Sequence, residues 1–117
     1  MADLSFGLMI ALLIAHELDA MKRHEWRILP LTSFLPEKLA EQVFLWAHVP
    51  LTLLVLWVFA QGPESGAALG LSGFAVLHVG LHWLFRNHPD NEFTGFAAWL
   101  PIIGAGGFGG FHVVAVV

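Results

Sequence analysis

Four apolar segments, residues 4–21, 43–60, 67–85 and 93–117, limit most strongly how this chain can fold. A helix needs about 20 residues to cross a bilayer, and the last three segments come near or exceed that length. The first segment reaches it only if His16, Glu17 and Asp19 lie within the bilayer or its interface. The sequence therefore predicts one integral membrane domain, residues 1–117, folded as an all-α bundle of four transmembrane helices.

The composition excludes several other classes of protein. Of the 117 residues, 57% are hydrophobic and only 12% are charged, whereas soluble domains carry about 25% charged residues. The five Lys and Arg residues form no stripe that could follow a phosphate backbone, so nucleic acid is not an expected partner. The absence of cysteine excludes disulfides, thiolate metal ligands and cysteine nucleophiles. The first segment has no basic residues before it, so we interpret it as a retained span.

The basic residues predict an orientation. All of them fall in the first and third connections between segments: Lys22, Arg23, Arg27, Lys38 and Arg86. Because basic loops stay on the cytoplasmic side, both termini are expected outside. The long first connection alternates charged and apolar residues, which favours an interfacial loop or short helix between the first two spans.

Local signals set the expected helix ends. Pro36 and Glu37 indicate that the second helix begins before its apolar segment. Pro89 is expected to separate the third and fourth helices, with Asp90 or Asn91 capping the fourth.

Histidines recur at one depth in three of the spans. His16, His48, His78 and His82 are expected to lie about 5–10 Å below the cytoplasmic face, and Glu92 begins the fourth segment at that face. Apolar spans carry such side chains rarely and usually for function. A structural role is the alternative to a functional one, because a buried neutral histidine can also join helices through a hydrogen bond.

Spacing turns this shared depth into a predicted metal site. His78 and His82 are four residues apart and share one helical face, and His16 and Asp19 are three apart. The predicted metal ligands are His16, Asp19, His48, His78 and His82. Without thiolates, this set of imidazoles and a carboxylate suits a divalent ion such as zinc or iron.

Two further carboxylates are candidate catalytic groups. Glu17 lies about 100° around the helix from His16, which favours a role as a base or as a hydrogen-bond partner of a ligand. Glu92 is expected to move protons beside the ion, as Glu17 would. His112 lies toward the other end of its segment and is left outside the predicted site.

Three stretches also carry a family resemblance: "HELDAMKRHEWRILP", "FLWAHVPL" and "HVGLHWLFRNHPDNEF". They resemble an uncharacterised family of small bacterial multi-pass membrane proteins, and are more distantly similar to HXXEE-domain membrane proteins. Against the HXXEE pattern the chain has His16, then Asp19 and Ala20 in place of the two glutamates. The resemblance implies a four-helix fold in the bacterial cytoplasmic membrane and a histidine–carboxylate centre suspected of binding metal, but it implies no activity.

Three functional classes therefore remain open, and the sequence does not decide whether the protein is an enzyme. The first is a metal-dependent hydrolase or oxidase acting on a lipidic or amphipathic substrate. The second is a small b-type haem protein with two of His16, His48 and His78 as axial ligands. The third is a non-catalytic accessory subunit or metal carrier. The lipid bilayer is the expected partner. The glycine-rich segments permit close helix contacts, which favour packing inside one small bundle but also allow a homo-oligomer or a larger membrane complex.

Overall fold

The computed structural model describes residues 1–117 as four long α-helices and one short 3₁₀ helix, with no strand. In chain order they are α1 (Ala2–Lys22), η1 (Glu25–Arg27), α2 (Glu37–Gln61), α3 (Gly66–Leu84) and α4 (Phe96–Val116). All four α-helices are long and apolar enough to cross a membrane. The predicted all-α bundle of four such helices, with a short helix between the first two, is confirmed, and it marks a multi-pass membrane protein.

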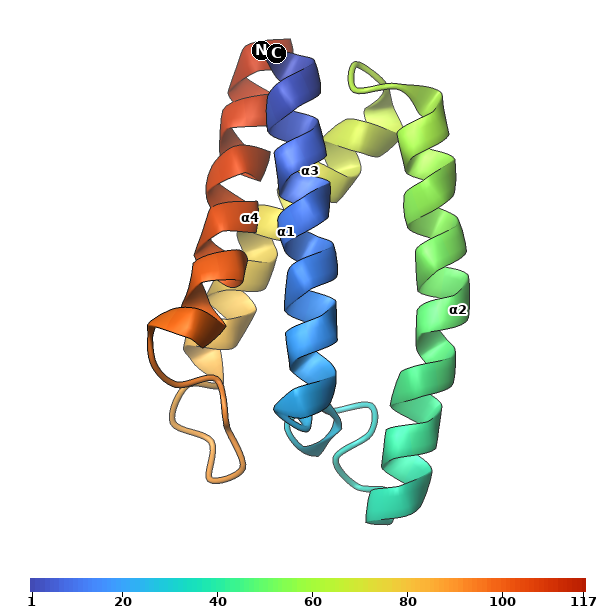
Figure 1. Ribbon diagram of the computed structural model, residues 1–117, viewed down its shortest axis with the longest axis vertical. Helices are drawn as coiled ribbons and strands as arrows, with labels where there is room; N and C mark the ends of the chain where they lie inside the picture. The colour runs from blue at the N-terminus through green and yellow to red at the C-terminus, as the bar shows by residue number, and fades with distance from the viewer.

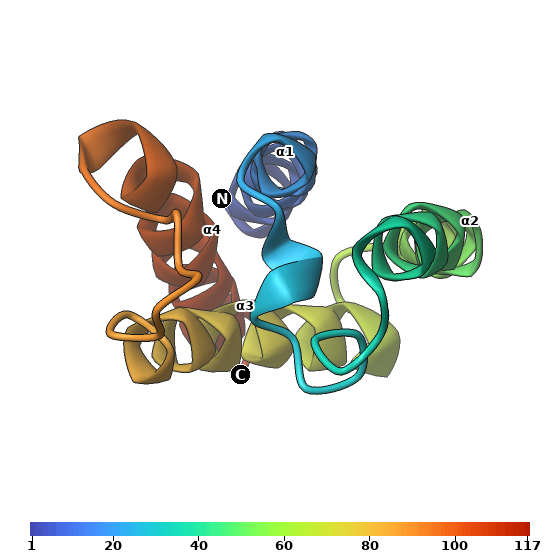
Figure 2. The same cartoon turned by 90° about the horizontal axis from the view of Figure 1, so that it is seen from below.

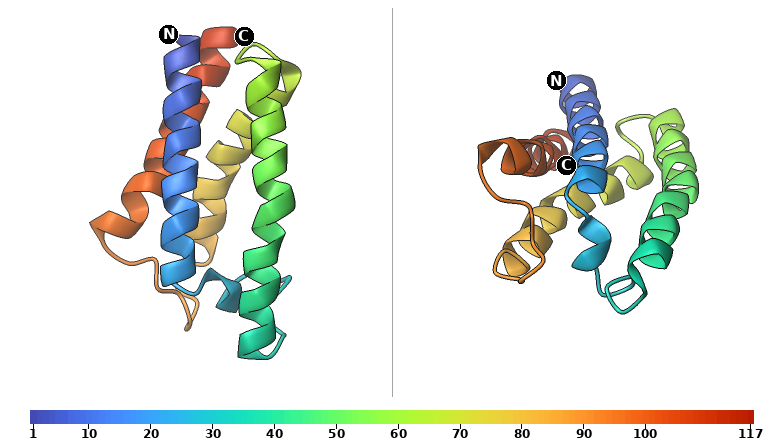
Figure 3. Two further views of the ribbon diagram at one scale, coloured as in Figure 1. Left: turned by 45° about the vertical axis from the view of Figure 1, so that its right-hand side comes forward. Right: turned by 60° about the horizontal axis from the view of Figure 1, so that its bottom comes forward.

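The four helices run up and down, so both termini lie at the same end of the bundle (Figure 1). Helix α1 lies between α4 and α2, and α3 runs diagonally behind it (Figures 1 and 3). The closest packing joins α1 and α3 to α4, whereas α2 stands at the edge of the bundle and is the least buried helix. The end opposite the termini carries η1 and the α3–α4 loop, and this is the end where all the basic residues lie.

Small residues allow α3 and α4 to approach closely. A Cβ atom at Gly109 would lie 2.8 Å from the carbonyl oxygen of Ser72 and 3.2 Å from the sulfur of Met9. Ala75 and Ala105 are fully buried in the same apolar cluster. Without water in the bilayer, such backbone-to-backbone contact is a principal source of helix association.

One helix end agrees with the sequence and another does not. Helix α2 begins at Glu37 directly after Pro36, as predicted. The prediction that Asp90 or Asn91 caps the fourth helix is wrong, because α4 begins at Phe96 after Gly95. The Asn91 side chain instead accepts a hydrogen bond from the N–H of Phe93, so it closes a turn within the loop.

His112 ties the other end of the bundle together. Its Nδ1 lies 2.8 Å from the Ser72 hydroxyl, and its Nε2 lies 2.7 Å from the carbonyl oxygen of Pro63 in the α2–α3 turn. The ring is fully buried, and both of its nitrogens have a partner. His112 is therefore a satisfied structural crosslink between α4, α3 and the turn.

We predict that Gly109→Ala destabilises the bundle by about 1–3 kcal/mol, because the added methyl group would collide with the α3 backbone. Thermal unfolding of the purified protein in detergent measures the effect. Gly107→Ala is the matched control, since nothing lies within 4 Å of a Cβ atom there. Equal melting temperatures for the two variants would contradict the close approach.

Candidate metal centre

Three histidines from two helices form one aromatic cluster. His16 comes from α1, and His78 and His82 come from successive turns of α3. Their ring centroids lie 4.6 Å apart for His16–His78 and His78–His82, and 4.8 Å apart for His16–His82. The i, i+4 spacing on α3 places both of its rings on the face that meets α1.

A glutamate from outside the transmembrane helices completes the group. After α1, His24 adopts a left-handed backbone conformation with φ of 53°. This uncommon turn redirects the chain, so η1 lies under the bundle between α1 and α3 (Figure 2). Glu25, the first residue of η1, is thereby buried with its carboxylate near the imidazoles.

The four side chains are spaced as metal ligands are. One ligand atom from each of His16, Glu25, His78 and His82 lies within 4.8 Å of all the others. The Nε2 atoms of His16 and His82 are 3.2 Å apart, and His16 Nε2 lies 3.6 Å from a Glu25 oxygen. Two nitrogen ligands about 2.0–2.1 Å from a tetrahedral zinc ion lie about 3.3 Å apart. This group of three histidines and one glutamate can hold a metal ion.

Buried atoms without partners support the same interpretation. His16 Nδ1, His78 Nδ1 and a Glu25 oxygen are buried and make no hydrogen bond. Each such atom costs free energy in an apolar interior, and native proteins leave few of them. A metal ion between the rings would be bound by the imidazole nitrogens and the carboxylate oxygen that face it. The protein supplies no acceptor for His16 Nδ1, so no outer carboxylate fixes the tautomer of this ring.

The carboxyl group of Glu25 is electrostatically unusual. Burial, followed by the negative charge of Glu17, raises its pKa from the ordinary value of 4.5 to about 8. At neutral pH the group therefore retains its proton unless a cation lies beside it. Metal binding would release that proton, since a carboxylate ligand must be ionised.

Aromatic rings close the cluster on its other sides. Phe93, from the α3–α4 loop, is almost fully buried, with ring centroids 4.6 Å from His82 and 5.6 Å from His16. Phe74 lies 5.5 Å from His78 on α3. The buried Phe93 ring keeps water from that side of the cluster, which strengthens electrostatic interactions there.

His48 and Glu17 lie outside the four-residue group and pair with each other. The Nε2 atom of His48 is 2.6 Å from a Glu17 oxygen, and its Nδ1 is 2.7 Å from the Phe44 carbonyl oxygen. The pair joins α1 to α2, which otherwise pack little against each other. His48 thus faces two acceptors and has no nitrogen turned toward the cluster of His16, His78 and His82.

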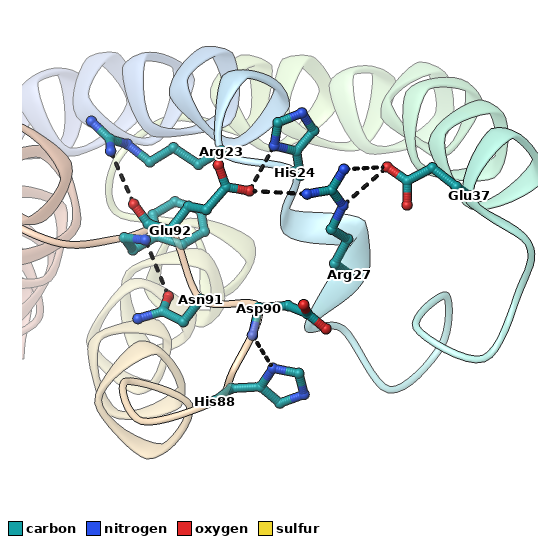
Figure 4. Close-up of polar contacts among 9 residues, drawn as sticks. Arg23, His24, Arg27, Glu37, His88, Asp90, Asn91 and Glu92 are labelled. Carbon is teal, nitrogen blue, oxygen red and sulfur yellow. Dashed lines mark hydrogen bonds and ion pairs between the residues drawn. The ribbon is translucent and has the colours of Figure 1, made fainter.

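Asp19 and Glu92 also lie outside the group, in a network of ion pairs at the end of the bundle. Asp19 pairs with Arg23 one turn along α1, at 2.5 Å. The Glu92 carboxylate lies 2.6 Å from His24 and 3.5 Å from Arg27, and Arg23 donates to the Glu92 backbone carbonyl oxygen (Figure 4). Both carboxylates are therefore occupied by cationic side chains, and the loop that carries Phe93 is anchored to the first connection.

Two residues of the centre, Glu25 and Phe93, were not identified from the sequence. Both lie in connections, where hydrophobicity gives no measure of depth. The one local signal is the "HEW" sequence, in which a charged residue is flanked by aromatic rings that contact each other at 5.1 Å. A charged residue between two packed aromatic rings can be buried with them. Whether Glu25 is buried depends on the left-handed turn at His24, which the sequence does not reveal.

We predict that the metal-free protein loses stability between pH 5 and pH 8 relative to Glu25→Gln. The folded state holds the Glu25 proton up to about pH 8, whereas the unfolded chain releases it near 4.5, so the folded state is favoured less as pH rises. Thermal unfolding after chelator treatment, measured across this pH range, compares the two proteins. Glu64→Gln, at an exposed turn, is the control. Parallel profiles for wild type and Glu25→Gln would contradict the burial of this carboxyl group.

Comparisons with known proteins assign no activity to the chain. No curated protein and no solved structure matches the chain. One family model, described as a family of unknown function (DUF6713), matches residues 2–117. The chain belongs to this family.

Proposed function

We propose that the protein is an integral membrane metalloprotein that binds one divalent transition metal through His16, His78, His82 and Glu25. The observation that carries this proposal is the convergence of four buried potential ligands from α1, η1 and α3 within 4.8 Å. The buried Nδ1 of His78 and one buried oxygen of Glu25 have no hydrogen-bond partner, while His16 turns its Nε2 toward the group. A purely structural network would be expected to satisfy these atoms, as the His112 crosslink does.

Zinc and iron are the metals that this donor set suits best. Three imidazoles and a carboxylate, without thiolates, match the borderline character of both ions. The spacing of His16 and His82 is close to that expected around tetrahedral zinc. Haem is less favoured, because the His16 and His78 rings contact each other directly and leave no slot for a porphyrin. The third candidate axial ligand, His48, is engaged by Glu17.

We further propose that the centre serves a hydrolase or oxidase whose substrate is lipidic or amphipathic. A bound zinc ion would supply Lewis-acid chemistry, and iron would supply redox chemistry. The histidines stand on packed helices and would hold position, while Glu25 stands on a three-residue turn and would hold or release a proton at its carboxylate. The site is enclosed by transmembrane helices, so a substrate dissolved in the bilayer has the shortest approach.

A metal carrier or accessory subunit is the second candidate, and one observation favours it. All four ligands come from the protein and are buried, which is typical of closed structural sites. A catalytic site keeps a coordination position open for water or substrate. The two functions differ in whether Glu25 occupies that position or leaves it to a substrate.

We predict that His16→Ala and His82→Ala each lower metal affinity at least about tenfold. Even the loss of an outer partner of a metal ligand usually costs about 10–100-fold, and a direct ligand should cost no less. Elemental analysis of protein purified without a polyhistidine tag, followed by competition with a chelator, measures the effect. Wild type is expected to retain one ion per chain.

Two histidines outside the group serve as matched controls. His88→Ala removes a partly exposed loop histidine, and His48→Ala removes the histidine that pairs with Glu17. Both variants should retain the ion. Equal metal content in the wild type and all four variants would contradict the proposed centre. Loss of metal in His48→Ala alone would indicate a site nearer α2.

We also propose that both termini face the outside of the cytoplasmic membrane. The end of the bundle opposite the termini holds every basic residue, and such residues accumulate on the cytoplasmic side. In this orientation the metal centre lies near the cytoplasmic face, within reach of the intracellular metal pool.

Because the chain has no cysteine, single cysteines can report its orientation. We predict that Glu64→Cys, in the α2–α3 turn, reacts with a membrane-impermeant maleimide in intact cells. Asn87→Cys, in the α3–α4 loop, should react only after the membrane is opened. Both positions are exposed in the fold. The reverse pattern would invert the proposed topology.

A further inference from the structure

The α3–α4 loop, residues 85–95, covers the histidine cluster with a single side chain. Phe93 is 1% exposed, and it is the one buried residue of this loop. Its ring lies against His82 of α3 and His16 of α1, with ring centroids 4.6 and 5.6 Å apart. The loop therefore meets two of the potential metal ligands through one aromatic ring, and the rest of it lies at or near the surface.

Hydrogen bonds inside the loop give it a shape of its own. The N–H of His88 bonds the Phe85 carbonyl oxygen, and the N–H of Asn91 bonds the His88 carbonyl oxygen, each at 3.0 Å. The Asn91 side chain donates to the Arg86 carbonyl oxygen at 3.0 Å and accepts from the Phe93 N–H at 3.1 Å. Because these bonds stay within the loop, it can move as a unit without losing them.

The loop is joined to the first connection through Glu92. The Glu92 carboxylate lies 2.6 Å from His24 Nδ1 and 3.5 Å from the Arg27 guanidinium (Figure 4). Arg23 donates to the Glu92 backbone carbonyl oxygen at 3.0 Å. The Glu92 side chain is 40% exposed, and such partly exposed ion pairs contribute little to stability. These contacts can therefore break without unfolding the bundle.

Gly95 supplies a point about which the loop can turn. Its φ of 83° and ψ of 174° lie in a region that residues with a Cβ atom avoid. Helix α4 begins at the next residue, and hinges commonly occupy such positions at the end of an element. Within the first turn of α4, the Trp99 indole N–H donates to the Phe93 carbonyl oxygen at 2.9 Å. Separation from the first connection thus leaves the loop attached to α4.

A metal ion reaches the centre from water, because the lipid interior strongly disfavours charge. His82 lies two residues before the end of α3, so the end of the bundle that carries the loop is the nearest source of water. The transmembrane helices are held by close contacts, as at Gly109, and cannot part easily. The first connection is anchored by two buried side chains, Trp26 and Ile28. Phe93 is therefore the most easily moved wall of the cluster.

We propose that the α3–α4 loop is a lid that opens at the end of the bundle opposite the termini and admits a divalent cation to the histidine cluster. Glu92 is the latch of this lid, Phe93 is its inner face and Gly95 is its hinge. Opening exposes the imidazole nitrogens of His16 and His82 to water, and closing returns the Phe93 ring over them. The admitted cation rests on the proposed metal centre, whereas the movement of the lid does not.

Cobalt(II) exchange tests the lid, with visible absorption following uptake and excess EDTA starting release. Glu92→Gln keeps the size of the side chain but removes its charge, so the latch weakens. Uptake and release should both become about fivefold faster than in wild type, the scale of one partly exposed charged contact. The dissociation constant should stay within about twofold, because Glu92 lies outside the group of ligands.

Glu37→Gln is the matched control. Glu37 also pairs with Arg27, but it joins that side chain to the start of α2 instead of to the loop. This variant should raise neither rate. Exchange rates that are unchanged in Glu92→Gln, or raised equally in Glu37→Gln, would overturn the lid.

Histidine modification of the metal-free protein separates the lid from the metal centre. Diethylpyrocarbonate modifies imidazoles that reach water, and peptide mass spectrometry reports each histidine. In Glu92→Gln, His82 should react about fivefold faster than in wild type, whereas His112, at the other end of the bundle, should react at the same rate. Faster His82 modification without cobalt binding by wild type would support the lid and overturn the metal centre. Cobalt binding with equal modification rates in both proteins would overturn the lid alone.

Discussion

The structure depends on how an apolar bundle accommodates polar side chains that water cannot reach. In a membrane interior each unpaired polar atom costs several kcal/mol, so it must find a partner within the protein or bind something else. Two of the histidine sites here have internal solutions, because His112 bonds Ser72 and a backbone carbonyl while His48 bonds Glu17. The group around His16 has no complete internal solution. That difference, rather than the number of histidines, separates a candidate metal centre from structural crosslinks.

Close helix packing makes the convergence at His16 possible. Glycine and alanine along α3 and α4 bring these helices into backbone contact, and α1 packs against both of them. The face of α3 that bears His78 and His82 is thereby held against α1. The centre thus depends on contacts well away from it, since a shift of α3 relative to α1 would change the distances between the imidazoles.

The connection between α1 and α2 meets the α3–α4 loop at the end of the bundle. The connection supplies Glu25 to the histidines, and the loop places Phe93 against the imidazoles. Glu92 joins the two segments, because it pairs with His24 and Arg27 (Figure 4). A change in either segment would therefore reach the candidate metal centre.

The four helices follow from the amino-acid sequence alone, because apolar segments of membrane length can satisfy their backbone only as helices. The shared face of His78 and His82 follows in the same way, since a spacing of four residues fixes it locally. Which ligands meet depends instead on how the helices and connections pack. His16 and His48 occupy similar depths on neighbouring helices, yet helix rotation turns one toward α3 and the other toward Glu17. Glu25 joins the cluster through one left-handed turn in a connection, where neither periodicity nor hydrophobicity records the direction of the chain.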